Sequence, residues 1–350
     1  MSSSRDQAYL KTRVGVFGAR LLLPKDIANY KRMTLDQLGE ALDLTPILED
    51  SLELQQKSRL IERALLSRIM FELSVLLRPA GGRTRGLLLY WPRKFELYNL
   101  KTLIRGKLND LDMEEIRDNL HDMPENIRLP HESLLQAENV LEMLRQLEQG
   151  PYAVIARQAR HVYEEKNEAF SLDAAIDRLY YTGMMRHLNM ADSSDKHGAQ
   201  KLISVLIDRQ NILWLMRYRL VYGFSSSEAY YTLIPTGGRI QRESLMVLAN
   251  LDNLQAIIEH LPTPFSELLL DVKDITQARQ RLDAFVGQEM RKLVRHSQDA
   301  VISSLAYLIA REIDQRVLYA IIHGKLLQMD PLLIDTAAPD NALERREVAA

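Results

Sequence analysis

The 350-residue chain contains no cysteine. This absence excludes disulfide bonds, thiol catalysis and cysteine-based metal sites, and it fits a reducing compartment. Glycine and proline, which interrupt helices, are also scarce at 15 and 12 residues. No apolar run approaches the roughly 20 residues needed to cross a bilayer. We therefore expect a helical protein that, if it works at a membrane, contacts it only through something embedded there.

The charge of the chain is nearly balanced. The formal net charge is −2 at pH 7 and the isoelectric point is about 6.5. Without a global basic bias, binding of the whole protein to nucleic acid or to anionic lipid is not indicated. The amino-terminal residues Met1 to Gln7 contain no apolar signal region.

The usual catalytic and metal-binding motifs are missing as well. The eight histidines are scattered and form no metal-binding pair on one helix face. Asp173 with Asp177, and Glu164 with Glu165, could serve as acid–base pairs, but neighbouring carboxylates on a helix are more often solvated or salt-bridged. The basic, glycine-rich stretch Arg78–Gly86 lacks the ending of a phosphate-binding loop and is interpreted as a turn. We expect no enzyme activity, no cofactor and no metal.

One pattern is present three times. An acidic residue is followed by an apolar run and then by two cationic residues, 9 and 11 positions after the acid. In the third copy the residue at position 9 is a histidine. The three stretches are Glu96–Lys107, Asp208–Arg219 and Asp314–Lys325, and their acids lie 112 and then 106 residues apart. A repeat with this long a period indicates a duplicated structural unit rather than a short motif.

The spacing also predicts which side chains share a helix face. Positions 0, +3 and +11 fall on nearly the same side, so Asp208, Asn211 and Arg219 should form one polar strip with Arg217 opposite. Asn99 occupies the same place as Asn211 in the first copy. A buried amide without a partner costs about 1–3 kcal/mol, so we expect both asparagines to bond to a neighbouring helix or to backbone.

A second apolar helix precedes each copy. Each of these preceding helices contains an acidic residue at a similar distance from the acid of the repeat. The three residues are Glu62, Asp177 and Asp283, which lie 34, 31 and 31 positions before it. Apolar spacing predicts one long helix from Leu48 to Leu77 and almost continuous helix from Ile275 to Asp330. We expect an all-α fold of three similar helical domains, at 1–127, 128–238 and 239–350, the last with a polar tail.

Several motifs resemble one known family. They are Tyr9-Leu-x-x-Arg13, Asn99-Leu-x-x-Leu-Ile-Arg-Gly-Lys107, Leu172-Asp-x-x-Ile-Asp177, Asp208-x-x-Asn211, Arg217-x-Arg219, Tyr231-x-Leu-Ile-Pro-x-Gly-Gly238 and Ile321-Ile-His-Gly-Lys325. In order and spacing they resemble the funnel-shaped component of rotary ATPases, called the C subunit in archaeal A-type and the d subunit in eukaryotic V-type enzymes. The resemblance covers nearly the full length.

The resemblance implies three helical domains about a pseudo-threefold axis that form a funnel. In that family the wide end rests on the membrane-embedded ring of proteolipid subunits. A narrower socket receives the tip of the central stalk, which consists of D- and F-type subunits. The resemblance therefore implies a non-catalytic rotor subunit at the cytoplasmic face, with no nucleic-acid partner and membrane contact only through the ring.

The third copy departs from the other two. It has Val317 in place of asparagine and His323 in place of arginine, which weakens the case for a shared function of these residues and favours a structural role for the repeat. Two alternatives remain: a free-standing helical-repeat adaptor and an enzyme with an unrecognised site. The adaptor is disfavoured because solenoid repeats run about 20–45 residues.

Six cationic residues at equivalent offsets are the candidates for partner binding. They are Arg105, Lys107, Arg217, Arg219, His323 and Lys325. Cations near a helix end also suit the helix macrodipole, so packing and capping is the simpler interpretation. If these residues instead present charge to a partner, reversing Arg217 and Lys107 together should weaken stalk or ring binding without unfolding the protein.

Overall fold

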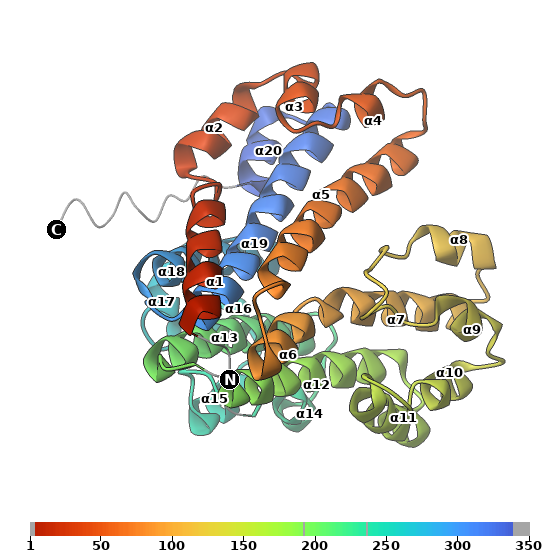
Figure 1. Ribbon diagram of the computed structural model, residues 1–350. Coiled ribbons are helices and arrows are strands. Elements are labelled where there is room, and N and C mark those ends of the chain that lie inside the picture. The colour runs from red at the N-terminus through yellow and green to blue at the C-terminus, as the bar shows by residue number, and fades with distance from the viewer. Residues whose placement is uncertain (1–3, 192, 236, 339–350) are drawn as a thin grey trace. The chain divides into compact units, whose positions relative to one another are not determined.

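The computed structural model describes residues 4–191, 193–235 and 237–338. All regular secondary structure in these residues is helical, which confirms the all-α prediction (Figure 1). The arrangement of three domains as a funnel stays a prediction. The helices are α1 (Ser4–Gly18), α2 (Pro24–Arg32), α3 (Leu35–Ala41), α4 (Thr45–Glu49), α5 (Leu54–Leu77), α6 (Gly82–Tyr90), α7 (Arg93–Leu108), α8 (Met113–Asp118), α9 (His131–Gln136), α10 (Val140–Gln146), α11 (Ala153–Lys166), α12 (Ala169–Met190), α13 (Lys196–Leu220), α14 (Ser226–Thr232), α15 (Arg242–Ala249), α16 (Leu254–Glu259), α17 (Phe265–Leu269), α18 (Ile275–His296), α19 (Ala300–Leu326) and α20 (Pro331–Ala337).

The helix boundaries correct two expectations and confirm a third. The long helix predicted from Leu48 begins only at Leu54, because α4 ends at Glu49 and extended residues follow. The turn predicted up to Gly86 ends at Gly82, where α6 begins. The almost continuous helix predicted from Ile275 is confirmed as α18 and α19, with one short break where the Asp299 side chain caps α19 by accepting the N–H groups of Val301 and Ile302.

One compact unit comprises Met1–Ala80 and Asp192–Ala350. Its central element is α19, which packs on α1, α5 and α18, while α13 packs on α18 (Figure 1). Every residue from Ala300 to Ala310 is buried, as expected for a helix enclosed on all sides. Glu72 of α5 is also buried and accepts a 2.7 Å hydrogen bond from the Tyr307 hydroxyl of α19.

The amino-terminal segment belongs to the core around the last long helix. Ile27 and Leu38 lie in one buried apolar cluster with Leu318, Ile322 and Ile334 of α19 and α20. At roughly 25 cal/mol per Å² of buried apolar surface, such side chains stabilise the fold by about 1.5–3 kcal/mol each. The first and last parts of the chain therefore stabilise each other, and the predicted division at residues 127 and 238 stays a prediction.

The second compact unit is Gly81–Ala191. Within it α12 packs on α6, α7 and α11, and α10 packs on α11 and α7. Two ion pairs join α7 to α12: Lys101 Nζ lies 2.7 Å from Asp177 Oδ1, and Arg105 pairs with Asp173. The Tyr180 hydroxyl donates to the Trp91 carbonyl at 2.9 Å. The long helix that precedes the Asp208 stretch is thus bound to the helix that carries the Glu96 stretch.

A glycine and an isoleucine make the same close approach in two copies of the repeat. A Cβ placed on Gly106 of α7 would lie 2.4 Å from Ile116 Cδ1 of α8. One placed on Gly324 of α19 would lie 2.7 Å from Ile334 Cγ1 of α20. Each isoleucine is the fourth residue of its short helix and is buried. The glycine is needed because the short helix packs directly on it.

In the remaining copy the sizes are exchanged. The position of Gly106 holds Tyr218, and the fourth residue of α14 is Ala229; both are buried. A large residue on the long helix is therefore combined with a small one on the short helix. The two positions therefore fill a similar volume, but here the large side chain belongs to the long helix and the small one to the short helix.

We predict that Gly106→Ala and Ile116→Ala are strongly coupled. Alone, Gly106→Ala should lower the free energy of unfolding by about 1–2 kcal/mol, because overpacking outweighs the helix propensity gained by alanine. In the Ile116→Ala background the same change should be neutral or stabilising, since the colliding side chain is gone. Urea unfolding of the four proteins measures the coupling, expected at about 2 kcal/mol. Equal effects of Gly106→Ala in both backgrounds would contradict this packing.

Candidate functional site

In each copy of the repeat, the acidic side chain holds a loop by accepting a hydrogen bond from the loop's backbone. The donor is the N–H of an apolar residue that lies two positions before a short helix, which is α9, α15 or α2. The bonds are Leu129 N–H to Glu96 Oε2 at 3.1 Å, Ile240 N–H to Asp208 Oδ1 at 3.1 Å and Leu22 N–H to Asp314 Oδ2 at 2.9 Å. The third donor lies 292 positions before its acceptor. The amino-terminal segment thus completes the third repeat, a closure that the sequence pattern did not predict.

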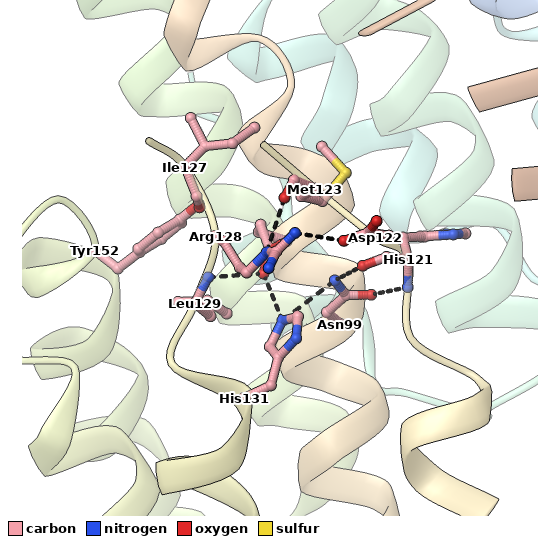
Figure 2. Close-up of polar contacts among 10 residues, drawn as sticks. Asn99, His121, Asp122, Met123, Ile127, Arg128, Leu129, His131 and Tyr152 are labelled. Carbon is pink, nitrogen blue, oxygen red and sulfur yellow. Dashed lines mark hydrogen bonds and ion pairs between the residues drawn. The ribbon is translucent and has the colours of Figure 1, made fainter. Parts of the chain in front are cut away.

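The two asparagines hold backbone in the same manner. Asn211 Nδ2 donates to the Ile234 carbonyl at 3.0 Å, and its Oδ1 accepts the Ile234 N–H at 2.9 Å. Asn99 does the same with His121, at 2.9 and 2.7 Å (Figure 2). Both side chains are buried. The expectation that each asparagine finds a backbone partner is confirmed.

Around Glu96 the loop is held by several more side chains (Figure 2). Glu96 is fully buried, and its Oε2 also lies 2.9 Å from His131 Nε2. The Tyr152 hydroxyl donates to the Ile127 carbonyl at 2.7 Å, and Arg128 Nε donates to the Met123 carbonyl at 2.8 Å. These bonds fix the connector between α8 and α9 on α7. The cluster therefore anchors this loop through Glu96 Oε2, while Glu96 Oε1 is buried without a hydrogen-bond partner among the described residues.

The electrostatics of Asp208 differ from those of an exposed carboxylate. Burial raises its pKa to about 6, although the backbone N–H groups of Arg239 and Ile240, at 2.8 and 3.1 Å, act to lower it. The ordinary value is 3.8. At a pH between 3.8 and about 6, Asp208 is therefore mostly protonated in the folded chain and mostly ionised in the unfolded chain.

We predict a pH-dependent stability term from Asp208. Because the folded pKa is the higher one, the stabilisation is fully present below about pH 4 and is lost as the pH rises through about 6. Asp208→Asn removes the titrating group, so the stability of the parent relative to the variant should fall by on the order of 2 kcal/mol between about pH 4 and 7. Urea unfolding across that range measures the difference. A difference that does not change with pH would contradict the raised pKa.

Three of the six candidate cations bind groups of their own compact unit. Arg105 is exposed and pairs with Asp173 of α12, and Lys107 Nζ donates to the Leu135 carbonyl at 3.1 Å. Arg219 donates to the Phe224 carbonyl and, at 3.3 Å, to the Leu251 carbonyl. These side chains hold the segments that follow α7 and α13. Their structural contacts do not by themselves exclude partner binding, which stays a prediction.

The other three candidates lie at the ends of α13 and α19. Since α13 is helical through this stretch, Asp208, Asn211 and Arg219 share a face as predicted, and Arg217 on the opposite face is exposed. The ring of half-buried His323 stacks on Tyr319 at 5.3 Å between centroids. Lys325 is half-buried. Within the part of the chain that the structure describes, the side chains of Arg217 and Lys325 make no hydrogen bond or ion pair.

The acid pairs considered as catalytic groups are largely engaged in ion pairs. Asp173 pairs with Arg105, Asp177 with Lys101, and Glu164 Oε1 lies 2.7 Å from Arg160 Nη1. This confirms their interpretation as salt-bridged carboxylates. Across residues 4–191, 193–235 and 237–338, no group of three histidine, aspartate or glutamate side chains could hold a metal ion. In the same residues no helix is both long enough and apolar enough to cross a bilayer.

Comparison with known proteins gives one family. The family model described as ATP synthase (C/AC39) subunit matches residues 10–336. That range includes all three copies of the repeat, the whole of the unit Gly81–Ala191 and most of the other compact unit.

Relatives match over most of their length at low identity. The C subunit of the A-type ATP synthase of Methanosarcina barkeri is 22% identical over 325 residues, covering 91% of this chain and 88% of the relative. The C subunit of the Pyrococcus horikoshii enzyme is 25% identical over 347 residues, covering 96% and 89%. That of Halorubrum lacusprofundi is 26% identical over 330 residues, covering 91% and 88%.

Proposed function

Because this chain belongs to the ATP synthase (C/AC39) subunit family, we propose that it is a rotor subunit of an A-type or V-type ion-translocating ATPase. In this role it couples the central stalk to the membrane proteolipid ring and catalyses no reaction of its own. The family match over residues 10–336 is the observation that carries the proposal. The relatives of nearly equal length are each named as the C subunit of an A-type ATP synthase.

The internal construction suits a part that transmits torque. Such a part must deform little under load. Rigid, closely packed elements with few unsatisfied hydrogen-bonding groups deform least. In each repeat a buried acid binds the backbone of the following loop, with the amino-terminal segment supplying that loop in the third. Ion pairs join α7 to α12 and, through Arg209 and Asp283 at 2.6 Å, α13 to α18. The loops are thereby fixed to the long helices.

The proposed partners are the proteolipid ring subunits and the D- and F-type subunits of the central stalk. The chain would be peripheral, at the cytoplasmic face of the membrane, and would contact the bilayer only through the ring. A full-length match to one ATPase subunit family disfavours the free-standing adaptor considered from the sequence.

Recovery of the partners tests the proposal. A tagged chain expressed in its own source, and purified from detergent-solubilised membranes, should bring with it a small, very apolar ring subunit together with stalk subunits. Recovery of the chain alone, from membranes whose ATPase is intact, would contradict the proposal and favour the adaptor.

We predict that two neighbouring arginines of α13 respond differently to substitution. Arg217→Glu should weaken stalk or ring binding by about 5–10-fold, with loss of the effect at high salt and unchanged stability, because the side chain is an exposed charge. Arg219→Gln should instead lower stability by about 1–3 kcal/mol, since two carbonyls lose a charged donor. Calorimetric binding and urea unfolding separate the two. Wild-type affinity of Arg217→Glu for both partners would remove Arg217 from the candidates.

A further inference from the structure

The acids of the helices that precede the repeats each face the long helix of a neighbouring copy. Asp177 of α12 pairs with Lys101 of α7, with 2.7 Å between Lys101 Nζ and Asp177 Oδ1. Asp283 of α18 pairs with Arg209 of α13, with 2.6 Å between Arg209 Nε and Asp283 Oδ1. Glu62 is the third of these acids and lies in α5, which packs on α19 within one compact unit (Figure 1). The same kind of ion pair is therefore expected between Glu62 and a cation of α19.

At this third place the cation is missing. Lys101 stands five positions after the acid of the first repeat, and the residue five positions after Asp314 is Tyr319. Burial raises the pKa of the Tyr319 hydroxyl, and the negative charge of Glu62 raises it further, so the two side chains are neighbours. Among the residues that the structure describes, none forms an ion pair with Glu62. The third junction therefore has a tyrosine beside its acid instead of a lysine.

The missing cation leaves Glu62 in an unfavourable environment. Burial raises its pKa above the ordinary value of 4.5, and no described cation offsets this effect. Burial acts on Asp283 in the same direction, but Arg209 and Arg316 hold the pKa of Asp283 below its ordinary value. Glu62 nevertheless remains exposed at the surface of α5. It is thus a partly desolvated carboxylate that a cation from outside the chain can reach and stabilise.

The neighbouring cations of α5 are engaged in other contacts. Lys57 Nζ donates to the Leu48 carbonyl at 2.8 Å. Arg59 and Arg63 also have interactions of their own. The helix that carries Glu62 therefore supplies no cation to this carboxylate.

Aromatic rings complete the surroundings of Glu62. The ring of His323 stacks on that of Tyr319 with 5.3 Å between centroids. Both residues are half-buried, so both can be reached from the surface. An ammonium group within about 6 Å of a tyrosine ring face gains cation–π attraction in addition to its pairing with a carboxylate.

We propose that Glu62, with Tyr319 beside it, is a docking point for a lysine side chain of a partner protein. The choice of lysine follows from the first repeat, where Lys101 fills the same offset and pairs with Asp177. The partner thus supplies from outside the cation that α19 lacks. This proposal rests on the proposed function, because the partner is sought in the assembled ATPase.

Zero-length cross-linking in the intact complex tests the occupant. A water-soluble carbodiimide activates the Glu62 carboxyl group, a lysine amine attacks it, and an amide bond forms as the carbodiimide leaves as a urea. In the ATPase purified from source membranes, peptide mass spectrometry should find Glu62 joined to a lysine of a different protein. Glu62→Gln should abolish this cross-link.

A matched variant controls for the loss of one surface charge. Glu40 of α3 is also an exposed helical glutamate that forms no ion pair with any described residue. Glu40→Gln should leave the cross-link from Glu62 unchanged. It should also bind the complex with the affinity of the parent chain, whereas Glu62→Gln should bind about fivefold more weakly.

Supplying the cation within the chain gives a second test. Tyr319→Lys places on α19 the residue type that the first repeat has at this offset. Carbodiimide should then join Glu62 to the new lysine within the isolated chain, and NMR titration should show that the pKa of Glu62 falls. In the complex this variant should lose the cross-link to the partner. Tyr319→Phe, which adds no cation, should retain it.

The outcomes separate this proposal from the proposed function. If the chain is present in the ATPase but Glu62 forms no cross-link to another protein, the proposal is overturned while the proposed function stands. A cross-link from Glu62 only to a lysine of its own chain has the same meaning. If the chain is absent from the ATPase, the proposed function itself fails.

Discussion

Asp314→Ala is expected to lower the free energy of unfolding by about 3–5 kcal/mol, because it removes one member of a buried ion pair. The Asp314 side chain is 1% exposed and that of its partner Arg291 is 11% exposed. The same carboxylate accepts the Leu22 N–H at 2.9 Å. Alanine would leave a buried guanidinium without its anion and would release the amino-terminal segment from α19. Urea unfolding gives the loss, and faster tryptic cleavage after Arg20 or Lys25 would show the release.

An ion pair with one exposed member provides the control. Lys31 of α2 lies 3.0 Å from Asp335 of α20, whose side chain is 59% exposed. Asp335→Ala should cost about 0–1 kcal/mol, as exposed pairs do. If Asp314→Ala costs no more than Asp335→Ala, the amino-terminal segment does not close the third repeat as described.

Asn211→Val should cost about 2–4 kcal/mol, the second largest effect. The substitution leaves both the N–H and the carbonyl of Ile234 without their partner, and each buried unsatisfied group costs about 1–3 kcal/mol. Ile234 is 1% exposed, so water does not replace the asparagine. Valine is the natural residue at this place in the third copy, Val317, so the residue type itself is compatible with the helix.

A surface asparagine provides the comparison for this prediction. Asn250 is exposed and donates only to the Met246 carbonyl of its own helix, at 3.0 Å. Asn250→Val should change stability by less than about 1 kcal/mol. Chemical unfolding of both variants under one set of conditions is the measurement. Losses of similar size would mean that the loop after α14 is not held by Asn211.

The sequence predicted the repeated elements because their signals are local. The spacing of Asp208, Asn211 and Arg219 defines a helix face by geometry alone, and the structure has the polar strip where that geometry puts it. The burial of an asparagine implies a partner, and the partners were found in the backbone of Ile234 and His121. Helix period and the cost of an unpaired amide are sufficient for both predictions.

The closure of the third repeat could not be predicted in this way. The Leu22–Asp314 bond joins residues 292 positions apart, and periodicity within a window carries no information at that separation. A weak signal did exist, since Leu22, Leu129 and Ile240 are each apolar and each stand two residues before a short helix. The contacts of Arg219 could not be predicted from the sequence either. They depend on the path of the loop after Gly223, a residue that adopts the left-handed conformation.

The most direct test of the central claim removes this chain from the assembled complex. In source membranes that lack the chain, the ring should remain in the bilayer while the stalk and the ATPase head dissociate on washing. Adding the purified chain should restore both stalk binding and ATP-driven ion pumping. If the stalk stays bound and pumping stays coupled to ATP hydrolysis without the chain, then it is not the part that couples stalk to ring.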